Sequence, residues 1–177
     1  MKIHVQIIPV DPAQPPEIPG RSSTAFETLW HYTTGQKLQG ILKAGEIRPS
    51  TSHLDAGEKP VVWFSSRPTW EPTATKCSVP GKLGQLITAK AQHGLVRIAV
   101  PASAVPYTFQ YVHLVAGTTP QTCAGLILAG LEMGADPNDW WFTPRPFPVA
   151  LFRGIELYDF GQDQWRAVDV AELACRN

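Results

Sequence analysis

The chain has little of what usually assigns a protein to a function class. Its 177 residues carry 15 Lys and Arg against 15 Asp and Glu, so the net charge is 0. That balance gives no support for nucleic-acid binding, which would then depend on a local basic patch. No apolar run approaches the roughly 20 residues of a membrane-spanning helix. We therefore expect no membrane partner and a cytoplasmic location.

Cysteine is scarce, with three residues and no CxxC pair. This excludes a zinc knuckle and a disulfide framework. The histidines have no metal-ligand spacing with one another or with the cysteines, so we expect no metal site. A nucleophilic pair of Cys77 and His93 has nothing nearby to activate the thiol, and an idle cysteine is the alternative. The absence of GxGxxG and Walker loops argues against a Rossmann or P-loop nucleotide site.

What is present indicates a single globular α+β domain over residues 1–177. Hydrophobic residues make up 44% of the chain and charged residues 17%, while 17 prolines and 14 glycines favour loops and short strands over long helices. Two helices are predicted, one between Thr34 and Gly45 and one over 120–134. An irregular stretch is predicted over 78–94. The predicted strands cover 3–10, 28–32, 60–66, 95–100, 109–115, 149–160 and 165–168.

The most informative stretch is the run 29–34, Leu-Trp-His-Tyr-Thr-Thr. It places His31 in an apolar, β-prone segment directly before a helix that Thr34 can cap. We expect the imidazole to lie at a strand end beside unpaired helix N–H groups, which suit anionic or carbonyl ligands. The alternative is a partly buried histidine whose ring is satisfied by one backbone carbonyl.

A second aromatic segment, 60–66, reads Pro-Val-Val-Trp-Phe-Ser-Ser. Together with the run 29–33 and the helix end 41–47 (Ile-Leu-Lys-Ala-Gly-Glu-Ile), it is similar to the ADP-ribosyltransferase-like superfamily. The closest likeness is to DarT-type toxins, and more distant ones are to tRNA 2′-phosphotransferases and poly(ADP-ribose) polymerases. The resemblance implies two small, mainly antiparallel sheets around a cleft that binds NAD as a substrate.

The resemblance also implies roles for individual residues. His31 would hydrogen-bond a ribose hydroxyl and Thr33 would support the nicotinamide amide, while Tyr32 adds a further polar contact. Trp63 or Phe64 would frame the nicotinamide ring. Ser65 or Ser66 would lie at its polar edge.

The chemistry calls for a carboxylate on a late strand. Breaking the nicotinamide–ribose bond builds positive charge on the sugar, which an anion beside the ribose stabilises. Glu156 is the predicted catalytic acid, although alignment with the polymerases' strand places Gly154 at the glutamate position. Either Glu156 serves through a local shift, or the protein is altered or inactive. The alternative for Glu156 is a solvent-facing glutamate on an antiparallel strand.

Glu71, next to Trp70, is a second acidic candidate, on a loop over the pocket or in a rigid surface turn whose tryptophan packs on the sheet. The aromatic run 140–142 offers a similar choice between stacking and core packing. The expected function is transfer of ADP-ribose to an unknown macromolecular or small acceptor, or hydrolysis of NAD. The alternative is a non-catalytic module on the same fold that binds a nucleotide or a protein.

Overall fold

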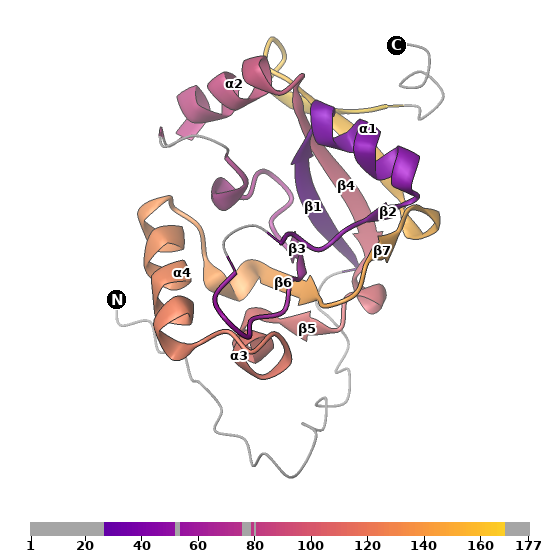
Figure 1. Ribbon diagram of the computed structural model, residues 1–177. Coiled ribbons are helices and arrows are strands. Elements are labelled where there is room, and N and C mark those ends of the chain that lie inside the picture. Colours follow the sequence, from indigo (N-terminus) through magenta and orange to yellow (C-terminus); the bar gives the residue numbers. More distant parts are fainter. Residues whose placement is uncertain (1–26, 52–53, 76–78, 80, 169–177) are drawn as a thin grey trace.

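The computed structural model describes residues 27–51, 54–75, 79 and 81–168, and there the chain is built around a seven-stranded sheet (Figure 1). All of its neighbouring strands pair in the antiparallel sense. The predicted strand 3–10, the proline-rich connector 11–20 and the expected turn 170–175 lie outside the described residues.

The strands of the sheet do not follow one another in chain order. Across the sheet the order is β5 (Tyr107–Thr108), β6 (Trp140–Thr143), β3 (Val62–Ser65), β1 (Thr28–Thr34), β4 (Leu95–Pro101), β8 (Gly154–Asp159) and β9 (Gln164–Ala167). A separate two-stranded pair joins β2 (Glu46–Ile47) to β7 (Phe147–Pro148).

The contact between β1 and β3 divides the large sheet into two parts. β1 pairs with β4 along its whole length, from Thr28 to Thr34, whereas β1 and β3 share the single pair Trp30↔Ser65. We call this line of weak pairing the seam. The prediction of an α+β fold is confirmed, but one seven-stranded sheet with a seam, plus the small pair, replaces the two small sheets that we expected.

Four α-helices accompany the described strands: α1 (Gly35–Ala44), α2 (Gly81–Ala91), α3 (Val112–Val115) and α4 (Pro120–Glu132). Single turns of 3-10 helix lie at η1 (Pro72–Ala74), η2 (Ala102–Ala104), η3 (Phe109–Tyr111), η4 (Pro137–Asp139) and η5 (Val149–Leu151). Helix α1 buries Leu38 and ends at Gly45, whose φ of 74° is the left-handed conformation that glycine adopts without strain.

Three sequence predictions of secondary structure are wrong. The stretch 78–94 contains α2, whose buried positions are the small or polar residues Gly84, Thr88 and Ala89, so it shows no apolar periodicity. The predicted strand 109–115 is η3 followed by α3. The predicted strand 149–160 begins with η5, and its extended part is β8.

The predicted helix over 120–134 is confirmed as α4. Cys123 and Gly130 are the buried positions of the helix. The large apolar side chains of Leu128 and Leu131 are instead exposed, at 62% and 39%. No helix in the described part of the chain is long and apolar enough to cross a membrane.

The main core lies where the two long central strands meet β8 and α1. Leu29, Ile98 and Ile155 come from neighbouring strands, and each is at most 4% exposed. Because Leu29 and His31 alternate with Trp30 and point to the same face of β1, this core lies beside the histidine. The sheet therefore fixes the backbone on which His31 is carried.

Candidate functional site

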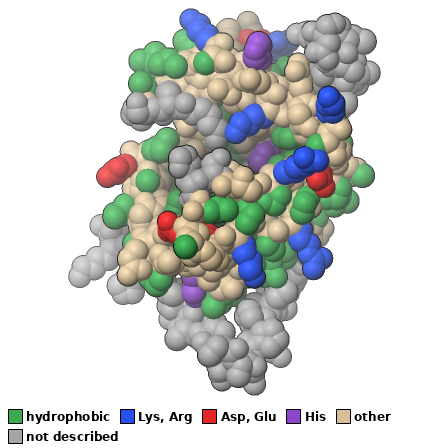
Figure 2. All heavy atoms as spheres, in the orientation of Figure 1, with side chains coloured by type: hydrophobic (Ala, Val, Ile, Leu, Met, Phe, Trp, Pro, Cys, Tyr) green, Lys and Arg blue, Asp and Glu red, His purple; other side chains and the backbone are tan. Residues whose placement is uncertain are grey.

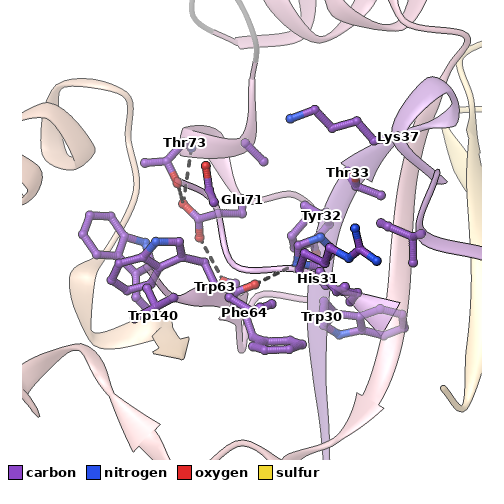
Figure 3. Close-up of a pocket in the computed structure, with 18 of the residues that line it drawn as sticks. Trp30, His31, Tyr32, Thr33, Lys37, Trp63, Phe64, Glu71, Thr73 and Trp140 are labelled. Carbon is purple, nitrogen blue, oxygen red and sulfur yellow. Dashed lines mark hydrogen bonds between the residues drawn. The ribbon is translucent and has the colours of Figure 1, made fainter. Parts of the chain in front are cut away.

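A cavity of about 790 Å³ opens at the seam, and residues of both sheet halves line it (Figure 3). Its walls come from β1, α1 and β2 on one side and from β3 and η1 on the other, with α4 closing part of the space. Four consecutive residues of β1, 30–33, line it.

His31 joins the two sides of the seam. Its Nδ1 lies 2.9 Å from the backbone oxygen of Trp63, and its ring meets the edge of Phe64 with centroids 5.8 Å apart. A carbonyl oxygen only accepts hydrogen bonds, so Nδ1 carries the proton and Nε2 is the acceptor in a neutral ring. In Figure 3 the imidazole lies between β1 and the aromatic segment of β3.

The opposite wall is the aromatic strand that the sequence indicated. Phe64 is buried, and its ring packs edge-on against Phe147 with centroids 5.1 Å apart. Trp63 is 36% exposed, and its ring packs against Phe142 with centroids 5.6 Å apart. This leaves a large apolar surface at the cavity. Ser65, buried, also lines the cavity.

Among the other predicted binding residues, Tyr32 and Thr33 line the cavity and Ser66 does not. Ser66 donates its hydroxyl to Asp139 Oδ1 at 2.6 Å and so ties the end of β3 to η4. The Tyr32 hydroxyl donates to the backbone oxygen of Arg67. Burial raises the pKa of Tyr32 far above its ordinary value, so the ring is neutral and can only act as a phenol.

Glu156 does not line this cavity. It lies on β8, two strands from β1 with β4 between, a lateral distance of about 10 Å. Its Oε2 accepts from Arg97 Nε at 2.6 Å, and the Arg97 guanidinium stacks over the ring of Trp30 at 4.0 Å. The ion pair thus belongs to the packing of β4 against β8, and the structure does not bring Glu156 together with His31.

The carboxylate that does line the cavity beside β3 is Glu71. It is 6% exposed, and Ser65 Oγ donates to its Oε2 at 2.9 Å. Thr73 donates to Oε1 through its hydroxyl at 2.9 Å and through its backbone N–H at 3.3 Å. The neighbouring Trp70 packs on the sheet, 5.1 Å from Tyr32, and its indole N–H donates to Thr75.

The sequence indicated Glu71 only as a second acidic candidate, because the turn after β3 decides where its side chain points. Glu46, from β2, is the other acidic residue on the described walls. It is half-buried, and its Oε1 accepts a hydrogen bond from Arg48 Nε at 3.1 Å. The aromatic run 140–142 is divided as alternation requires: Trp140 and Phe142 are buried, and Trp140 lines the cavity.

The start of α1 differs from the expected anion site. The N–H groups of Gly35 and Gln36 donate to the carbonyls of Gly94 and Gln92, both at 3.0 Å, so they are already paired. The Thr34 side chain makes no capping bond. The positive charge at the cavity comes instead from Lys37 and Arg48, which line it.

Figure 2 shows more Lys and Arg than Asp and Glu side chains around the hollow of this face. In the described residues no three His, Cys, Asp or Glu side chains are placed to hold a metal ion.

Comparison with models of protein families, with curated proteins and with solved structures finds no match to this chain.

Proposed function

We propose that this protein binds NAD in the cavity at the seam and transfers its ADP-ribose to an acceptor or to water. The support comes from two short motifs that, by the resemblance, are parts of one nucleotide site. His31 and Trp63 are 32 positions apart in the chain, yet they are hydrogen-bonded to each other on the cavity wall. The members of those motifs that line the cavity are His31, Tyr32, Thr33, Trp63, Phe64 and Ser65.

The shape and polarity of the cavity suit a dinucleotide. Its volume of about 790 Å³ lies within the range of about 300–1,000 Å³ that is usual for cofactor sites. In the proposed complex the nicotinamide ring lies against Trp63 or Phe64, and His31 bonds a ribose hydroxyl. Lys37 and Arg48 then supply positive charge for the diphosphate, which the net charge of the chain did not suggest.

The chemistry in such a site is the loss of nicotinamide. The bond between ribose C1′ and the nicotinamide nitrogen breaks, and its electron pair neutralises the pyridinium. The positive charge passes to the sugar, which an acceptor or water then attacks, releasing a proton. Apolar walls exclude water, and this strengthens the electrostatic attraction between the sugar cation and any anion placed beside it.

A second function has one observation in its favour. Glu156, the catalytic acid predicted from the sequence, is paired with Arg97 and does not line the cavity. A cleft without that carboxylate fits a non-catalytic module that holds a nucleotide or a protein. Release of nicotinamide separates the two functions, because a binding module leaves NAD intact.

Calorimetric titration with NAD tests the binding step. We expect the full chain to bind NAD and the His31→Ala variant to bind about tenfold more weakly, since one hydrogen bond and its aromatic contact are lost. His113→Ala, on α3 and away from the cavity, is the control. Absence of heat with the wild-type protein, or equal affinity in both variants, would contradict the proposal.

A further inference from the structure

Glu71 has a setting that no other described carboxylate shares. It is almost fully buried on the wall of the cavity, and three hydrogen bonds hold it in one orientation. An ionised carboxylate offers about four acceptor positions, so one remains beyond those three. Ser65 donates to Oε2 alone, whereas Oε1 receives both bonds from Thr73. Capacity for a further bond is therefore greatest at Oε2.

The same short strand connects Glu71 to His31. The backbone oxygen of Trp63 receives the imidazole, and the hydroxyl of Ser65 holds the carboxylate. These two positions on β3 are about 7 Å apart along the strand. Figure 3 shows Glu71 and His31 on either side of this segment. Both groups line one cavity, and each is anchored on β3, two positions apart.

We propose that Glu71 is the catalytic carboxylate of this site and contacts the ribose that loses nicotinamide. The inference rests on the proposed function. As the C1′–nitrogen bond breaks and its electron pair leaves with nicotinamide, the Glu71 anion faces the cation that forms on the sugar. When water is the acceptor, its oxygen bonds to C1′, its proton passes to Glu71, and the carboxylate then returns the proton to solvent.

The substitution Glu71→Gln isolates the charge from the structural role. The glutamine oxygen can still accept from the N–H and hydroxyl of Thr73, and its amide can donate to Ser65 Oγ, which has acceptor capacity. The cap of η1 is thereby kept. Asp139→Asn is the matched control, since Asp139 also accepts a serine hydroxyl at the end of β3, from Ser66, but does not line the cavity.

The experiment measures NAD binding by calorimetry and release of nicotinamide by chromatography, using the full chain. NAD is supplied with water alone and with mixed protein, DNA and RNA, so that hydrolysis and transfer both count. We expect Glu71→Gln to bind NAD within a few-fold of wild type. Its rate of nicotinamide release should fall by a factor of about 100 or more. We expect Asp139→Asn and Glu156→Gln to retain turnover, and the thermal midpoint of each variant reports on folding.

The outcomes distinguish this inference from the function on which it rests. Without NAD binding by the wild type, the proposed function fails and the inference fails with it. Binding without any release of nicotinamide keeps the nucleotide site and rejects catalysis by Glu71. Release that persists in Glu71→Gln, or that disappears in Asp139→Asn or Glu156→Gln instead, rejects Glu71 while leaving the proposed function intact.

Discussion

Helix α4 approaches β6 so closely at Gly130 that a single methyl group should disturb it. A Cβ at this position would lie 2.5 Å from Cη2 and 2.6 Å from Cζ2 of the Trp140 indole. That ring has little room to move away, because it is 7% exposed and meets Phe109 edge-on with centroids 5.0 Å apart. The substitution Gly130→Ala therefore forces α4 and Trp140 apart.

The magnitude follows from two opposing contributions. Overpacking of a well-filled core costs about 1–3 kcal/mol, and replacing glycine by alanine inside a helix returns about 0.5–1 kcal/mol. Gly125 lies on the same helix, and a Cβ there meets nothing within 4 Å. Gly125→Ala therefore carries only the favourable contribution. The difference in free energy of unfolding between the two variants should be about 1–3 kcal/mol, with Gly125→Ala the more stable.

Urea denaturation and thermal melting measure this difference directly. For a chain of this size we expect the melting midpoints to differ by about 3 °C for each kcal/mol. Since Gly130 and Trp140 both line the cavity, Gly130→Ala should also weaken NAD binding, while Gly125→Ala leaves it unchanged. Equal stability of the two variants would refute the placement of α4 against Trp140.

Two further expectations concern the ion pair of Arg97 with Glu156 and the buried phenol of Tyr32. Arg97→Met leaves Glu156 partly buried without its partner and should lower the free energy of unfolding by about 2–4 kcal/mol. The double variant Arg97→Met with Glu156→Gln should recover part of that loss. Urea denaturation in which the two losses simply add would contradict the coupling. Because burial raises the pKa of Tyr32 above its ordinary 10.0, its contribution to stability is complete below pH 10 and is lost as pH rises further. Absorbance titration, compared with that of Tyr32→Phe, should show Tyr32 resisting ionisation until the chain unfolds.

The sequence indicated His31 and Trp63 because each belongs to a local pattern. His31 lies in an apolar run before a helix, and Trp63 lies in a run of β-branched and aromatic residues. Their contact across the seam was suggested by the resemblance and is seen here as one hydrogen bond. Glu156 could not be placed in the same way. Whether a strand residue reaches the cavity depends on strand order, and β4 separates β8 from β1.

The helix α2 and the role of Glu71 were hidden for related reasons. The buried positions of α2 are Gly84, Thr88 and Ala89, which carry no hydrophobic periodicity, while its Leu83 is 61% exposed. Glu71 is a charged residue in a proline-containing turn, a composition typical of surface loops. Its burial results from the hydroxyls of Ser65 and Thr73, and hydrogen bonds of that kind have no sequence period.

The seam gives the large sheet a mechanical property that a continuous ladder would lack. Paired backbone residues connect β1 to β4 along the whole of β1. Between β1 and β3 the connection consists of one backbone pair and the hydrogen bond of the His31 side chain. Side chains therefore help to set the width of the cleft, since Tyr32 of β1 also donates its hydroxyl to the backbone oxygen of Arg67, just past β3. A ligand that holds the imidazole also fixes how far apart the two halves of the sheet stand, so occupancy of the site and stiffness of the whole sheet are coupled.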